Sequence, residues 1–189
     1  MANKIFATIE FTDGNLINLE LFPDVAPITV ANFVKLCNAH FYDGLCLHRV
    51  IDKFMIQGGG YVYDDNLMGL IEKKTLATIK GEFKSNGVKN DLSHTKGTIS
   101  MARTSVKDSA SSQFFICVAD TPHLNGEYAA FGRCADEQSL KTAIAYGKVK
   151  TGKWQYYSDV PLTPIVIRTI TIKNQDTYKN QDSVKKTNA

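Results

Sequence analysis

The sequence lacks any long hydrophobic run and any strong excess of one charge. No apolar stretch approaches the roughly 20 residues that a transmembrane helix needs, and the first residues show neither the apolar core nor the cleavage site of a signal peptide. The 22 basic and 19 acidic residues give a net charge of +3, too small and too dispersed to indicate a nucleic-acid interface. We therefore expect a cytoplasmic protein that binds neither membranes nor nucleic acid.

Motifs for metals, nucleotides and hydrolytic catalysis are also missing. The four cysteines include no Cys-x-x-Cys pair, and no two of the four histidines stand three or four residues apart. The run Gly58–Gly60 has neither dinucleotide-binding nor P-loop spacing, so it predicts a tight bend or a close backbone approach. Ser111 and Ser112 lie outside any G-x-S-x-G pattern. No metal, cofactor or hydrolytic triad is expected.

The amino-terminal half opens with two clear periodic patterns. Apolar residues alternate over Ile5–Phe11 and again over Ile17–Leu21, which predicts a β-hairpin. Asp13-Gly14 between them suits a type I′ turn, in which both central residues need positive φ. Over Pro27–Ala39 apolar residues recur at i, i+3, i+4 and i+7, which predicts a helix that begins at its proline.

Further along the chain, short runs rich in Ile, Val and Phe predict strands. They are Leu45–Ile51, Phe54–Gln57, Gly97–Ala102, Gln113–Ala119, Ala129–Cys134 and Ile165–Ile172. A second helix fits Glu137–Tyr146, with Asp136 as its N-cap and Gly147 as its stop. About eight strands that mostly do not alternate with two helices favour an antiparallel sheet or barrel over a parallel βαβ fold.

The carboxyl-terminal residues have a different composition. From Asn174 onward apolar residues nearly vanish, so little burial can offset the entropy of ordering this segment. The sequence therefore predicts one domain, residues 1–173, followed by a polar and flexible tail, residues 174–189.

Composition and periodicity do not reveal function, but three segments do. They read LHRVIDKFMIQGG at 47–59, KGTISMARTS at 96–105 with SSQFFICVAD at 111–120, and HLNGEYAAFGRC at 123–134. Together they resemble the cyclophilin family of peptidyl-prolyl cis-trans isomerases, especially its bacterial cytosolic members, and the resemblance extends more loosely from the first strand to Ile172. It implies a mainly β fold, a closed eight-stranded antiparallel β-barrel capped by two α-helices, with the active site on the outer face.

The resemblance also implies a role for each site residue. Arg49 matches the principal catalytic residue, and Gln57 and Gln113 match two glutamines that contact substrate and position the arginine. The implied substrate-binding residues are Phe54, Met55, Phe115 and Leu124 around the proline ring, backbone groups of Ala102 and Arg103 beside the preceding residue, and His123 and Tyr128 at the rim.

Three rim positions depart from the family pattern. His123 stands where well-studied eukaryotic members carry tryptophan, Tyr128 where they carry histidine, and Arg103 where they carry asparagine. These substitutions leave the isomerase chemistry in place. They imply that cyclosporin can bind, but with weakened affinity.

The expected partners are proline-containing peptides and unfolded or flexible proteins whose folding the chain assists, and a monomer is expected. The alternative is a proline-peptide binding module or holdase chaperone with incidental catalysis, but Arg49 favours the enzyme because binding alone would not need it. Residues 61–81 form a longer segment than in compact members. They are interpreted either as a lid or secondary substrate contact, or as a divergent surface loop.

Overall fold

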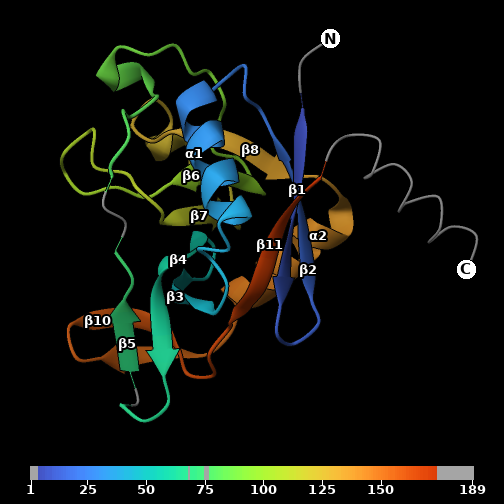
Figure 1. The fold of residues 1–189 in the computed structure, drawn as a ribbon, viewed down its shortest axis with the longest axis vertical. Coiled ribbons are helices and arrows are strands. Elements are labelled where there is room, and N and C mark those ends of the chain that lie inside the picture. The colour runs from blue at the N-terminus through green and yellow to red at the C-terminus, as the bar shows by residue number, and fades with distance from the viewer. Residues whose placement is uncertain (1–3, 68, 75–76, 174–189) are drawn as a thin grey trace, which may run out of the picture.

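The computed structural model describes residues 4–67, 69–74 and 77–173, and its secondary structure is mainly β (Figure 1). The elements are β1 (Ile5–Phe11), β2 (Leu16–Leu21), α1 (Pro27–Asn38), β3 (Leu45–Ile51), β4 (Met55–Asp64), β5 (Gly69–Glu72), β6 (Thr98–Met101), β7 (Phe114–Cys117), β8 (Ala130–Cys134), α2 (Glu137–Gly147), β9 (Thr151–Trp154), β10 (Tyr157–Pro161) and β11 (Ile167–Lys173). The tail predicted at 174–189 lies outside the described residues.

Eight strands follow one another in a curled antiparallel sheet in the order β11-β1-β2-β8-β6-β7-β4-β3, and a ninth, the short β5, pairs with the end of β4. The two end strands approach each other at a short seam, where Cys46 and Val166 form an isolated bridge and the Leu47 N–H donates to the Ile165 carbonyl over 2.9 Å. The expected eight-stranded antiparallel fold with two helices is confirmed. Its closure is weaker than a complete barrel implies, because this seam replaces a full ladder between the end strands.

The two helices have the predicted positions but different N-terminal caps. At α2, the Asp136 side chain accepts a hydrogen bond from the Ser139 N–H over 2.7 Å, as predicted. At α1, the cap residue Ala26 offers no side-chain acceptor. The buried Glu82 carboxylate replaces it from another segment, accepting from the N–H of Thr29 over 2.6 Å and from its hydroxyl over 2.7 Å. A negative charge at this end also suits the helix dipole.

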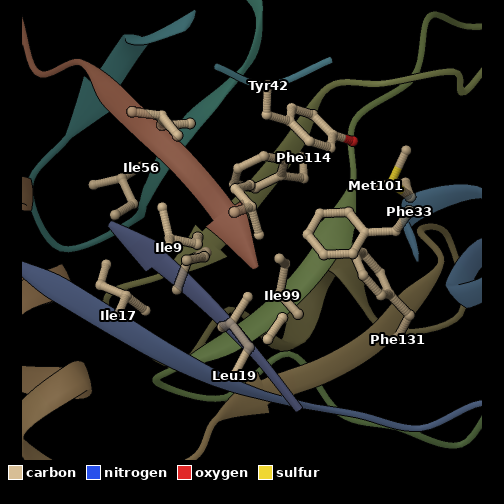
Figure 2. Close-up of a cluster of buried hydrophobic side chains, with 14 of the residues drawn as sticks. Ile9, Ile17, Leu19, Phe33, Tyr42, Ile56, Ile99, Met101, Phe114 and Phe131 are labelled. Carbon is tan, nitrogen blue, oxygen red and sulfur yellow. The ribbon is translucent and has the colours of Figure 1, made fainter. Parts of the chain in front are cut away.

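The main core fills the inside of the curled sheet, and on one side of it several aromatic residues meet (Figure 2). The α1 residue Phe33 lies 5.4 Å from Tyr42, 5.8 Å from Phe114 and 5.3 Å from Phe131, measured between ring centroids. Rings at these separations and inclined to each other add specific contacts to the burial of apolar surface. They join α1 to β7 and β8, and β7 carries part of the site described below.

The turn between β1 and β2 differs from the type I′ turn that was predicted. Gly14 has a φ of 88°, but Asp13 is not among the described residues with positive φ. The Gly14 N–H donates to the Phe11 carbonyl over 3.0 Å, and the Phe11 N–H donates to Asn15 over 3.0 Å. This is a longer loop with a single left-handed glycine, which also makes a tight hairpin.

The pattern did not predict strands β5, β9 and β10. Strand β4 continues through the three glycines to Asp64 and pairs there with β5, while β9 and β10 form a separate hairpin beside it (Figure 1). Trp154 of β9 packs on Gly69 of β5 so closely that a β-carbon on the glycine would overlap the indole ring. These short strands cover a small second cluster around Cys46 and Leu70 instead of the main core, so their apolar periodicity is weak.

Candidate active site

An apolar cluster lies on the outer face of the sheet, apart from the main core. Successive side chains of a strand point to opposite faces. In β7, Phe114 and Ile116 therefore belong to the main core, whereas Phe115 and Cys117 belong to the outer cluster. The buried members of the outer cluster are Met55, Phe115, Cys117 and Leu124. The alternation that builds the core thus also supplies the floor of an external site.

An open pocket of about 120 Å³ lies over this cluster. Its lining residues are Arg49, Phe54, Met55, Gln57, Ala102, Arg103, Phe115, Leu124 and Tyr128. Every site residue that the sequence predicted is in this set except Gln113 and His123. Gln113 lines the neighbouring pocket, and the exposed His123 ring stacks on Phe54 at the rim, with centroids 5.7 Å apart and planes inclined by 18°.

Arg49 reaches the pocket through a β-bulge in β3. The register pairs Leu47 with Gly58 and Arg49 with Gln57, so His48 is one extra residue on β3. The bulge lets both His48 and Arg49 lie outside the main core, although they are adjacent in sequence. Bulges commonly redirect a side chain beside an active site.

Three polar side chains form a row along one edge of the pocket. Arg49 Nη1 donates to Gln57 Oε1 over 3.4 Å, and Gln57 Nε2 donates to Gln113 Oε1 over 3.1 Å. Arg49 is exposed and makes no ion pair within the described part of the chain. A guanidinium has five N–H donors, and this long contact uses one of them. The row therefore holds the Arg49 guanidinium beside the pocket, and its remaining N–H groups can donate to a ligand.

The sequence predicted backbone groups of Ala102 and Arg103 in the site, and the structure adds a separate role for the Arg103 side chain. That side chain is only 11% exposed. It donates to the Glu127 carbonyl from Nε over 3.1 Å and from Nη2 over 2.8 Å, and to the Thr104 carbonyl over 2.9 Å. Its guanidinium lies 4.7 Å from the Tyr128 ring centroid. It therefore fastens the segment that carries Tyr128 to the pocket edge, which no sequence spacing indicated.

A second pocket of about 250 Å³ adjoins the first. Its lining residues are Gln57, Glu72, Ala102, Arg103, Thr104, Ser109, Ser111 and Gln113. Glu72 comes from β5, which lies within the long segment 61–81. In the described part of this segment, β5 therefore pairs with the end of β4, and the Glu72 carboxylate of β5 forms part of the wall of the second pocket.

Two groups behind the pocket that could exchange a proton, Cys117 and His94, are buried. Burial raises the pKa of the Cys117 thiol to about 11. His94 lies behind Phe115, with Nδ1 3.1 Å from Asn125 Oδ1 and Nε2 2.9 Å from Ser100 Oγ, and burial lowers its pKa. Because an amide oxygen only accepts, Nδ1 carries the hydrogen. Among the described residues no cluster of His, Cys, Asp and Glu could hold a metal ion. The arrangement suits binding and electrostatic stabilisation more than proton transfer.

His48, next to Arg49, is a buried histidine with an unsatisfied ring nitrogen. The residue is 6% exposed, its ring lies 4.4 Å from that of Tyr61, and its buried Nδ1 has no hydrogen-bond partner. Burial, assisted by the positive charge of Arg49, lowers the pKa of His48 to about 4. The unfolded chain binds this proton near pH 6.5. Folding stability therefore falls as the pH drops from about 6.5 to 4, because protons then favour the unfolded state.

Replacing His48 with phenylalanine should flatten this pH dependence. The shift in the His48 pKa corresponds to roughly 3 kcal/mol of unfolding free energy between pH 7 and pH 4, and the phenyl ring retains the contact with Tyr61. Urea unfolding at several pH values measures the difference. As a matched control, His40→Asn removes an exposed histidine and should keep the wild-type slope. Parallel curves for wild type and His48→Phe would contradict the prediction.

Known proteins resemble this chain over most of its length. A family model described as cyclophilin type peptidyl-prolyl cis-trans isomerase/CLD matches residues 6–172. A peptidyl-prolyl cis-trans isomerase of Acinetobacter baylyi is 43% identical over 171 residues, which cover 88% of this chain and 84% of that protein. Peptidyl-prolyl cis-trans isomerase B of Escherichia coli is 37% identical over 171 residues, covering 87% of this chain and 98% of that protein.

Solved structures agree with these sequence matches. The crystal structure of a cyclophilin type isomerase from Cryptosporidium parvum matches with a TM-score of 0.73 at 26% identity, covering 91% of this chain and 99% of that one. A structure of the same protein in the presence of the dipeptide Ala-Pro matches with a TM-score of 0.71 at 28% identity, covering 90% of this chain and 99% of that one.

The fold, the outward-facing pocket and these similarities define an enzyme that catalyses rotation about X–Pro peptide bonds, a peptidyl-prolyl cis-trans isomerase. The chain belongs to the cyclophilin family. The resemblance inferred from three sequence segments is thereby confirmed.

Proposed function

We propose that the proline ring of a substrate lies in the pocket above Met55 and Phe115, and that Arg49 donates a hydrogen bond to the prolyl nitrogen during rotation. The observation that carries this proposal is the row of Arg49, Gln57 and Gln113 at the edge of an apolar pocket. No nucleophile, metal or cofactor is needed for this chemistry.

The peptide bond resists rotation because resonance gives it partial double-bond character, with a barrier of roughly 18–20 kcal/mol. Halfway through rotation the resonance is lost and the prolyl nitrogen gains a localised lone pair. A donor aimed at that lone pair stabilises the transition state and neither ground state, which is the condition for a higher rate. An arginine guanidinium suits the task because it is always charged and presents rigid donors.

The pocket contributes as much as the arginine. A rate gain of about 10⁶ requires about 8 kcal/mol, whereas one hydrogen bond to a charged group supplies roughly 1.5–3 kcal/mol. The remainder comes from fixing the proline ring and from excluding water, which strengthens the hydrogen bond from Arg49. Met55, Phe115 and Leu124 are each at most 8% exposed, so their positions are fixed before substrate arrives.

The open site supports a flexible, extended chain as the substrate. The Ala102 N–H already donates to the Gln113 carbonyl over 3.0 Å, so the Ala102 carbonyl is the group that would pair with the residue before proline. The C. parvum structure obtained with Ala-Pro supports proline-containing peptides as ligands, and unfolded proteins whose folding the enzyme assists are their natural source. The alternative of a holdase with incidental catalysis makes no use of the Arg49 row.

Location and oligomeric state belong to the same proposal. All four cysteines are free, which supports the reducing environment of the cytoplasm. No helix in the described part of the chain is long and apolar enough to cross a membrane. We infer that the enzyme acts as a cytoplasmic monomer.

The segment 61–81 supports a secondary substrate contact through Glu72. Glu72 lines the second pocket, which shares Gln57, Ala102 and Arg103 with the first, so a peptide held at Ala102 would pass it on the side that precedes proline. Glu72 pairs only loosely with the exposed Lys74, over 3.6 Å. Its carboxylate would therefore favour a basic side chain in a substrate.

A protease-coupled isomerisation assay tests both the proposed catalysis and the proposed contact of substrates with Glu72. Tetrapeptides Lys-X-Pro-Phe and Glu-X-Pro-Phe, which chymotrypsin cleaves after phenylalanine only when X–Pro is trans, should both isomerise faster with enzyme. The lysine peptide should be preferred about 2- to 5-fold, the effect of an exposed ion pair. Glu72→Lys should reverse the preference, whereas Asp159→Lys, on the separate β9–β10 hairpin, should not. Peptide binding without any gain in rate would favour the holdase, and an unchanged preference in Glu72→Lys would exclude the contact.

A further inference from the structure

The three consecutive glycines of β4 each lie against a different neighbour. A β-carbon on Gly58 would meet the Leu47 side chain at 2.8 Å and the Cys46 carbonyl at 3.0 Å. Gly59 has a φ of 92°, which disfavours other residues, and its β-carbon position is 2.8 Å from a backbone carbonyl, that of Ser112. At Gly60 the nearest atoms belong only to the Gln113 side chain, at 2.6–2.7 Å. The first two glycines are required by the backbone and core, but the third makes room for a side chain of the site.

The Gly60 backbone has little freedom to move away from Gln113. Its carbonyl accepts a hydrogen bond from the Lys73 N–H over 2.7 Å, just after β5. The backbone of Gln113 is fixed as well, because its carbonyl accepts from the Ala102 N–H over 3.0 Å and the preceding Ser112 carbonyl accepts from the buried Tyr42 hydroxyl over 2.9 Å. If an atom were added at position 60, the Gln113 side chain would be the part that moves.

The displaced side chain is the end of the polar row. Gln113 Oε1 accepts from Gln57 Nε2 over 3.1 Å, and Gln57 Oε1 in turn accepts from Arg49 over 3.4 Å. The atoms that a β-carbon at Gly60 would meet include Nε2 and Cδ of this same Gln113 amide. Moving the amide would break its bond to Gln57 and free Gln57 to rotate, so the guanidinium would lose its fixed partner.

We propose that Gly60 is a positioning residue for the isomerase reaction. The missing side chain leaves the space in which Gln113 lies, and Gln113 holds Arg49 in place through Gln57. The proposal rests on the proposed role of this row in catalysis. The run Gly58–Gly60 resembles no nucleotide-binding motif, and the function proposed here belongs to its last glycine.

Gly60→Ala should lower kcat/KM about 2- to 12-fold, the effect of losing one neutral hydrogen bond. The loss should appear in kcat with KM nearly unchanged, because the row acts on the transition state. The matched control is Gly152→Ala in β9, a strand glycine whose β-carbon would meet only the Leu162 side chain. This control should keep wild-type turnover.

A double-mutant cycle with Gln113→Ala separates positioning from general damage. Gln113→Ala removes the atoms that Gly60→Ala would strike, so Gly60→Ala should have no further effect in that background. An equal loss in both backgrounds, or wild-type activity of Gly60→Ala, would overturn the proposed role of Gly60. If Gln113→Ala alone leaves turnover unchanged, the role proposed for the row itself is wrong. Gly60→Ser provides a second variant with the same expectation should Gly60→Ala fold poorly.

Discussion

Replacing Arg49 with alanine should lower kcat/KM by about 100-fold or more and leave the fold intact. The proposed hydrogen bond to the prolyl nitrogen exists only in the transition state, so its loss should fall on kcat, whereas the apolar pocket should still bind peptides weakly. The free energy of unfolding should change little, because Arg49 is exposed and makes one long hydrogen bond to Gln57. The protease-coupled assay gives the rate, and circular dichroism and thermal unfolding give the fold.

Two comparisons sharpen the test of Arg49. Arg168→Ala removes another exposed arginine, paired with Glu10 on β1 away from the pocket, and should leave turnover unchanged. The wild-type rate should also be nearly flat from about pH 6 to 8.5, since arginine stays charged over this range, the proposed mechanism transfers no proton, and the lowered pKa of His48, about 4, keeps that ring neutral. Wild-type turnover in folded Arg49→Ala, or a steep bell-shaped pH profile, would refute the mechanism.

Local patterns in the sequence predicted the elements whose apolar residues face the main core. In the opening hairpin apolar residues alternate with polar ones, and in both helices they recur at helical spacing. These apolar residues face the main core, so the periodicity is strong. Strand β4 is longer than predicted because Gly58–Gly60 suggested either a tight bend or a close backbone approach. In the structure these glycines lie inside the strand, where the register with β3 is irregular, and the close approach is the alternative that is found, since Gly59 lies against the Ser112 carbonyl. Strands β5, β9 and β10 escaped prediction because they cover only the small cluster around Cys46 and Leu70.

The pocket residues could not be predicted from periodicity alone. Phe114 and Phe115 are adjacent and chemically identical, yet one lies in the core and the other in the floor of the site. Only the resemblance of the surrounding segments to a known family identified Phe115 and Arg49. The bulge at His48, which turns Arg49 outward, depends on the pairing of β3 with β4. Such long-range pairing leaves no local trace in the sequence.

The exposed ring of His123 should make the enzyme active but poorly inhibited by cyclosporin. The family's tryptophan at this position offers the drug an indole N–H and a broad apolar face. His123 instead presents a smaller ring, stacked on Phe54 at 5.7 Å. Losing one neutral hydrogen bond costs roughly 0.5–1.5 kcal/mol, and losing some tens of Å² of apolar contact adds about 1 kcal/mol at roughly 25 cal/mol per Å². The affinity should therefore be roughly 10- to 100-fold weaker than with tryptophan.

Restoring tryptophan isolates the contribution of this position. His123→Trp should tighten cyclosporin inhibition by roughly 10- to 100-fold, measured by titrating the drug in the isomerase assay. Turnover of small prolyl peptides should change much less, because it depends on Arg49 and the deeper pocket. His123→Ala is the matched control: it removes the ring without adding an indole, so it should not tighten inhibition. Tight inhibition of the wild type, or unchanged inhibition of His123→Trp, would show that another part of the rim controls drug binding.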